Sequence, residues 1–118
     1  MTIKQYAHRI CTECGIKPQN VGYTYTVEAI LMLYEDRSYS AYGITKRLYP
    51  AIAEKYGSTW CRVERAMRHA ISTGKSKHTN SNFILSAVNF IDYCKEQEET
   101  EENYQQAKRA IFNSLMFG

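Results

Sequence analysis

Residues 50–71 read PAIAEKYGSTWCRVERAMRHAI, and this stretch is the most informative in the chain. A proline opens it, as is common in the first turn of a helix, and Gly57 is placed to end that helix. Ser58 or Thr59 can then N-cap a longer helix that reaches about Ser72. A short helix, a turn that contains glycine and a second helix are the layout of a helix-turn-helix.

The second of these helices has one apolar half and one polar half on a helical wheel of about 100° per residue. The apolar half holds Val63, Ala66, Met67, Ala70 and Ile71. The polar half holds Cys61, Arg62, Glu64, Arg65, Arg68, His69 and Ser72. We therefore expect the first half to pack on the body of the domain and the second half to face outward.

The residue types on the outward half suit double-stranded DNA. The major groove admits an α-helix, and an arginine there can donate two hydrogen bonds to O6 and N7 of guanine. A glutamate can accept from the amino group of cytosine, and arginines on successive turns neutralise phosphates. The alternative is a solvated surface helix with i,i+4 charge pairs, such as Glu64 with Arg68.

Charge is distributed unevenly along the 118 residues, although the formal net charge is only +3. Residues 46–77 contain eight basic and two acidic residues, whereas residues 92–102 contain six acidic residues and one lysine. This asymmetry favours a polyanion-binding surface in the middle of the chain. An ordinary solvated surface is the alternative on charge alone.

Helical periodicity continues over nearly the whole chain, and no convincing β-type alternation occurs. Further helices are expected over residues 3–14, 24–35, 44–48, 80–91 and 104–115, with loops over 36–42 and 73–78. Asn80 or Ser81 is the expected N-cap of the helix at 80–91. The sequence thus predicts an all-α fold: a single compact domain of about six or seven helices containing a helix-turn-helix.

Two parts of this chain are expected. Residues 1–95 form the helix-turn-helix domain, and residues 96–118 form an acidic segment plus a C-terminal amphipathic helix. That last helix has more apolar surface than a solvated tail needs, so it either folds back onto the domain or docks a partner or a second copy. The acidic segment can also mimic phosphates and shield the basic helix.

No catalytic or metal-binding set is expected. The chain lacks a phosphate-cradling glycine loop and a nucleophile elbow, so we predict that it is not an enzyme and needs no cofactor. His8, Cys11 and Cys14 share one arc of the first helix, but a structural zinc site needs four ligands. Buried thiols that act as small hydrophobes are the favoured interpretation, so no metal is expected.

The expected compartment is the cytoplasm, with no membrane partner. No apolar run approaches the about 20 residues of a membrane span, and the N-terminus does not read as a secretory signal. The four cysteines, at positions 11, 14, 61 and 94, should therefore be mostly reduced.

Ten tyrosines and a single tryptophan raise the question of base stacking, as in proteins that bind single strands. Most of the tyrosines fall on the predicted apolar stripes, so core packing is the favoured interpretation. Trp60 lies in the first turn of the outward-facing helix. Its indole can either pack under the helix or reach the sugar-phosphate backbone of the DNA.

Several ordered blocks carry a resemblance to a known family. They are GYTY at 22–25, EAI at 28–30, ITKRLYP at 44–50, IA at 52–53, RVERAMRHAI at 62–71 and TNSNFI at 79–84. Over about residues 1–92 the chain resembles the DNA-binding effector domain of the response regulator called stage-zero sporulation regulator A (Spo-zero-A) of endospore-forming bacteria. The resemblance implies an all-helical domain that binds promoter DNA at short TGTCGAA-like boxes, often as tandem copies, and represses or activates transcription.

The resemblance also implies site residues. The recognition helix would cover about residues 59–72, with Glu64 and Arg65 as the pair that reads bases. Positions at or near the DNA backbone would be Arg62, Arg68, His69, Lys75, Lys77, Ser58 and Thr59. We therefore expect a sequence-specific transcription regulator, and the alternative is an interaction or dimerisation module that uses the C-terminal helix, with DNA binding weak or lost.

The chain departs from the family in three places. It leaves no room for the receiver domain with its phosphoacceptor aspartate, so control by phosphorylation is in doubt. Residues 73–78 replace a longer segment that, in the family, lies near the surface touching the sigma factor of RNA polymerase, so activation is in doubt and repression or competition is favoured. Residues 96–118 have no counterpart in the resemblance.

Overall fold

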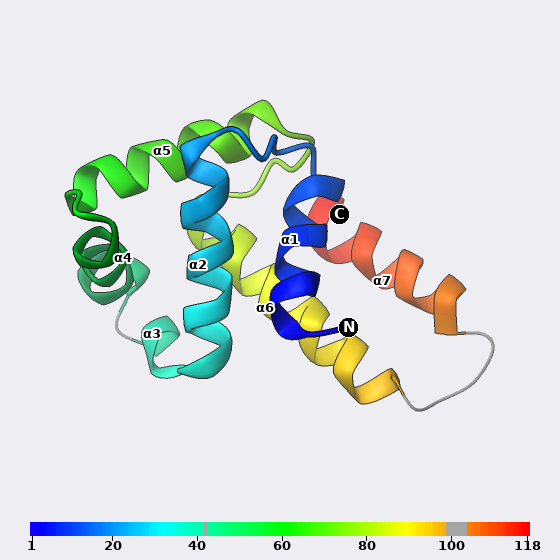
Figure 1. Ribbon diagram of the computed structural model, residues 1–118. Coiled ribbons are helices and arrows are strands. Elements are labelled where there is room, and N and C mark those ends of the chain that lie inside the picture. The colour runs from blue at the N-terminus through cyan, green and yellow to red at the C-terminus, as the bar shows by residue number, and fades with distance from the viewer. Residues whose placement is uncertain (42, 99–103) are drawn as a thin grey trace.

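The structure is a computed structural model that describes residues 1–41, 43–98 and 104–118 (Figure 1). Over these residues the chain is helical and contains no strand, so the predicted all-α fold class is confirmed. Residues 44–48 form a single turn of π-helix, named η1. The elements in chain order are α1 (Ile3–Glu13), α2 (Val21–Glu35), α3 (Ser38–Ala41), η1 (Ile44–Leu48), α4 (Tyr49–Tyr56), α5 (Trp60–Thr73), α6 (Asn80–Gln97) and α7 (Tyr104–Phe117).

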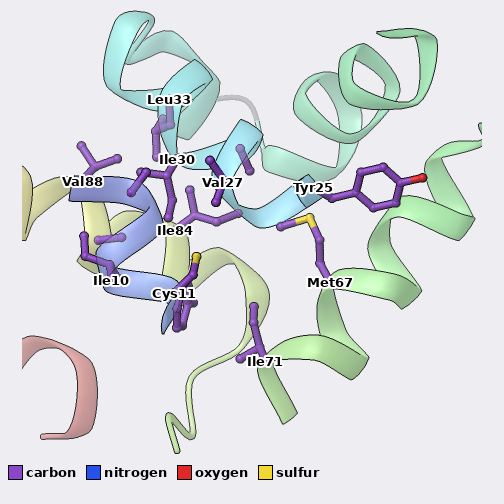
Figure 2. Close-up of a cluster of buried hydrophobic side chains, with 14 of the residues drawn as sticks. Ile10, Cys11, Tyr25, Val27, Ile30, Leu33, Met67, Ile71, Ile84 and Val88 are labelled. Atoms are coloured by element: carbon purple, nitrogen blue, oxygen red, sulfur yellow. The ribbon is translucent and has the colours of Figure 1, made fainter. Parts of the chain in front are cut away.

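Helix α2 lies at the centre of the domain and packs against α1, α5 and α6 (Figure 1). Its sequence is apolar on most sides, as expected for a helix that is surrounded by others. Figure 2 shows the buried cluster that these helices build together. Its labelled members include Ile10, Cys11, Val27, Ile30, Leu33, Met67, Ile71, Ile84 and Val88.

The predicted helix-turn-helix is present as α4 and α5. Gly57 ends α4 in a left-handed conformation, with a φ of 62°, and its N–H donates to the carbonyl oxygens of Ala53 and Glu54. Thr59 is the N-cap of α5, and its hydroxyl oxygen accepts a hydrogen bond from the backbone N–H of Arg62 at 3.3 Å. Of the two predicted caps, Thr59 is therefore the one used.

Two predicted boundaries near α2 were wrong. Helix α2 begins at Val21, three residues before the expected start, because the side chain of Asn20 accepts from the N–H of Gly22 at 2.9 Å and caps the helix there. Residues 38–41 form the short helix α3 where a loop was expected. Asp36 opens that turn by accepting hydrogen bonds from both the N–H and the hydroxyl of Ser38.

The N-cap of α6 was also predicted wrongly. Thr79 caps the helix by accepting from the N–H of Asn82 at 3.3 Å, and neither Asn80 nor Ser81 serves as the cap. The side chain of Asn80 instead donates to the backbone carbonyl of Glu64 at 3.1 Å and ties α6 to α5. Helix α6 then continues to residue 97, beyond its expected end at residue 91.

The C-terminal helix folds back onto its own domain. Phe112 and Met116 of α7 are buried, and the Phe112 ring meets Phe90 of α6 edge-on at 5.1 Å between centroids. Nε2 of His78 lies 2.7 Å from the carbonyl oxygen of Leu115, which joins the end of α7 to the segment between α5 and α6.

The predicted boundary between the two parts of the chain, after residue 95, falls inside α6. The division of the chain at this point stays a prediction.

The predicted shielding of the basic helix is tested only in part, because residues 99–103 lie outside the described residues. Asp92 accepts two hydrogen bonds from the guanidinium of Arg37, at 2.8 and 2.9 Å. Glu98 lies 3.0 Å from the ammonium of Lys95 and accepts from the hydroxyl of Tyr6. Both carboxylates thus bind groups outside α5. Shielding of α5 by Glu99, Glu101 and Glu102 stays a prediction.

Candidate nucleic-acid interface

The orientation of α5 is fixed by its inner face. Val63, Met67 and Ala70 are fully buried, as the helical wheel predicts. Gly22 of α2 lies directly against α5, where an added Cβ would overlap the carbonyl oxygen of Ala66 and lie 2.6 Å from Cβ of Ala70. This close approach needs a residue without a side chain, and it holds the opposite half of α5 outward.

The predicted outward residues do face outward. Arg62, Arg65, Arg68 and His69 are all exposed. Within the described part of the chain, the guanidinium groups of Arg62 and Arg65 make neither an ion pair nor a hydrogen bond. Side chains that carry charge and have no internal partner are available to an external one, and phosphates or base edges are the natural acceptors for arginine.

Glu64 and Arg68 form the predicted i,i+4 pair. Nε of Arg68 lies 3.6 Å from Oε1 of Glu64, and the two side chains are 65% and 28% exposed. An exposed pair of this length contributes about 0–1 kcal/mol, so external groups can readily displace either partner. The presence of the pair therefore fits both the solvated-helix alternative and a DNA-facing helix.

A groove of about 690 Å³ runs along the side of α5. Glu64, Arg68 and Ser72 form its α5 wall, and the short α5–α6 segment supplies Lys75 and Lys77. Both lysines are exposed. The full lining consists of Thr45, Tyr49, Glu64, Arg68, Ser72, Gly74, Lys75, Ser76, Lys77, His78, Thr79, Asn80 and Ser81.

The segment that carries the two lysines is tied to the body. The N–H of Lys75 donates to the carbonyl oxygen of Cys14 at 2.7 Å, and Gly74 packs so closely on that carbonyl that a Cβ would overlap it. Ser76 is buried, and its hydroxyl oxygen accepts from the N–H of His78 at 3.3 Å. The positions of Lys75 and Lys77 relative to α5 are therefore set by backbone contacts with α1.

Other predicted site residues occupy the turn before α5. Thr59 is exposed, with its hydroxyl engaged as the helix cap, and Ser58 is half-buried. Sequence reasoning missed Thr45 and Tyr49 as groove residues. Both belong to the block at 44–50 that carries the resemblance, but nothing in their spacing indicated that η1 and α4 would face α5.

The cysteines are thiols whose surroundings differ. Cys11, Cys14 and Cys94 are buried, whereas Cys61 on α5 is partly exposed. Burial raises the pKa of the Cys14 thiol to about 12, with the nearby Glu13 carboxylate as a smaller cause, and burial likewise raises the pKa of Cys11. Nowhere in the described ranges do three or more His, Cys, Asp or Glu side chains gather to hold a metal.

We expect Cys61 to be alkylated first when the native protein meets iodoacetamide at neutral pH. The thiolate is the reacting form, and the burial that raises the pKa of Cys14 and Cys11 also blocks access to them. Peptide mass mapping over time measures the order, with a denatured sample as the control in which all four cysteines react. Native Cys14 reacting as fast as Cys61 would contradict the burial of the first helix.

An all-α body that presents a helix-turn-helix with an arginine-bearing outer face is the architecture of many DNA-binding regulatory domains. Residues 7–105 match the family described as Sporulation initiation factor Spo0A C terminal, and the chain belongs to that family. It is a family of DNA-binding effector domains in the regulation of sporulation, and it is not a family of enzymes. The match includes residues 96–105, for which the resemblance alone gave no counterpart, and it ends within α7.

In the described residues, no helix combines the length and the apolar character that crossing a membrane requires.

Proposed function

We propose that the protein is a sequence-specific regulator of transcription that inserts α5 into the major groove of promoter DNA. The observation that carries the proposal is Arg65, which lies about 180° from the centre of the buried face of α5. Its guanidinium is exposed and has no partner within the described residues. Arg65 would donate two hydrogen bonds to a guanine, and Glu64 would accept from a cytosine amino group.

The groove beside α5 supports a path for one strand of the duplex. Arg68 on α5 and both Lys75 and Lys77 on the α5–α6 segment line it. Cations spaced in this way neutralise phosphates and fix the register of the helix without reading sequence. Arg62 and His69, on the other edge of α5, would face the second strand.

A labelled TGTCGAA-like duplex and a scrambled duplex of equal length test the proposal by fluorescence anisotropy. We expect the box to bind at least about tenfold more tightly, since one mismatched base pair costs about 1–3 kcal/mol. Equal affinity for the two duplexes would overturn sequence-specific binding. Binding to neither duplex would overturn DNA binding by this domain.

We expect Lys75→Ala to weaken binding to every duplex by the same factor. A lysine that contacts a phosphate contributes no sequence information, and its loss lowers the slope of log K against log salt by about one. The backbone bond from Lys75 to Cys14 survives the substitution. Salt titrations of both duplexes measure the slope, with Lys4→Ala on α1 as a control of equal charge; an unchanged slope would remove Lys75 from the phosphate path.

Two further features of the regulator are part of this proposal. A second copy of the protein would bind at a tandem site on the DNA. Repression or competition is favoured over activation, because residues 73–78 are shorter than the corresponding segment of the resembled family. The alternative of an interaction module through the C-terminal helix has less support. Phe112 and Met116 are already buried against the domain, and among residues 107–117 of α7 the large apolar residue that stays exposed is Phe117, at 42%.

A further inference from the structure

Trp60 is the first residue of α5, and 48% of it is exposed. By angle alone it falls on the same side of α5 as Met67 and Ile71, which are buried. Val63, one turn further along, is already fully buried. Burial on this side of α5 is therefore complete from the second turn onward, whereas about half of Trp60, in the first turn, is open to an external partner.

The indole makes no polar contact in the part of the chain that the structure describes. No hydrogen bond, ring contact or cation contact involves it there, so its N–H, which can only donate, has no protein acceptor. The neighbouring exposed aromatic, Tyr56, differs in this respect. Its hydroxyl donates to Glu28 at 3.2 Å, and its ring meets Tyr25 edge-on at 5.6 Å.

Trp60 does not line the groove described above, but it lies in line with the α5 residues that do. Residues 60, 64, 68 and 72 follow each other at i,i+4 spacing and form a ridge about 18 Å long on one edge of α5. The last three line the groove together with Lys75 and Lys77. The indole thus lies at the leading end of the edge along which the proposed function places a DNA strand.

We propose that Trp60 contacts the sugar-phosphate backbone of that strand, with its ring against a deoxyribose and its Nε1–H donating to a phosphate oxygen. This inference rests on the proposed function. The N-terminal end of a recognition helix enters the groove, and Cα–Cβ bonds lean toward that end, so the indole projects ahead of the helix. Such a contact is indifferent to sequence.

The test uses the fact that Trp60 is the only tryptophan in the chain, so intrinsic fluorescence reports on it alone. The wild-type protein is titrated with the TGTCGAA-like duplex while emission and acrylamide quenching are followed, and labelled-duplex anisotropy measures binding independently. We expect the emission to change with the same midpoint as the anisotropy, and the indole to lose accessibility to acrylamide.

A substitution measures the contribution of the contact. We expect Trp60→Ala to weaken binding by about threefold to tenfold, equally on the box and on the scrambled duplex. Because about half of the residue is exposed and its indole N–H has no protein acceptor in the described residues, the midpoint of thermal unfolding should change little. Phe117→Ala, which removes an exposed aromatic from α7, is the matched control and should bind DNA as wild type does.

The outcomes separate this inference from the proposed function. Wild-type binding by anisotropy with unchanged emission and quenching would overturn the Trp60 contact alone. A Trp60→Ala loss confined to the box would also overturn it, because the contact would then read sequence. Protection of Trp60 by raised protein concentration without DNA would assign the indole to self-association. Failure to bind any duplex would overturn both.

Discussion

Replacing Arg65 by alanine is expected to abolish most of the preference for the TGTCGAA-like box. The substitution removes a bidentate donor to a guanine, which costs about 1–3 kcal/mol at that base pair and relaxes specificity there. Competition titrations measure it, with unlabelled box and scrambled duplexes displacing a labelled box. Binding to the scrambled duplex should fall far less, because the phosphate contacts remain.

Two further variants make this result specific. Arg65→Lys keeps the positive charge and loses the planar fork, so it should keep general affinity and still lose discrimination at one base pair. Arg9→Ala removes an exposed arginine from α1, and it should leave discrimination intact. If Arg65→Ala discriminated between the two duplexes as well as the wild type does, Arg65 would not read bases.

The sequence predicted α5 well because its pattern is strongly periodic. Of the five predicted apolar positions, Val63, Met67, Ala70 and Ile71 are buried and Ala66 is half-buried. Arg62 and Arg65 face outward as the wheel requires. The turn before it is equally local, since a left-handed glycine and a hydroxyl cap need only adjacent residues. Features of this kind depend on short-range stereochemistry, which can be read without the rest of the fold.

The features that sequence reasoning missed depend on distant contacts. Thr79 and Asn80 are both good caps, and the choice between them follows from the bond that Asn80 makes to Glu64 on another helix. The groove depends on η1, whose position relative to α5 has no local signal. For Trp60, the wheel supplies an angle, but only the assembled body shows that 48% of the residue stays exposed.

Gly22→Ala provides a test in which local and tertiary reasoning predict opposite signs. Alanine within a helix is about 1 kcal/mol more favourable than glycine, so helix propensity alone predicts a gain in stability. In the folded domain the new methyl group would overlap the carbonyl oxygen of Ala66, and that atom belongs to backbone that cannot rotate away. We therefore expect the free energy of unfolding to fall by about 1–3 kcal/mol, as for an overpacked core.

Urea unfolding measures this change, with Thr24→Ala as the control, because Thr24 lies on the exposed side of the same helix. A gain in stability for Gly22→Ala would mean that α2 and α5 do not approach as closely as described. The same contact sets how far α5 stands from the body. The Gly22→Ala protein that still folds should therefore bind the box more weakly than the wild type. This loss is expected even though Gly22 lies against the inner side of α5 and the substitution removes none of the outward arginines of that helix.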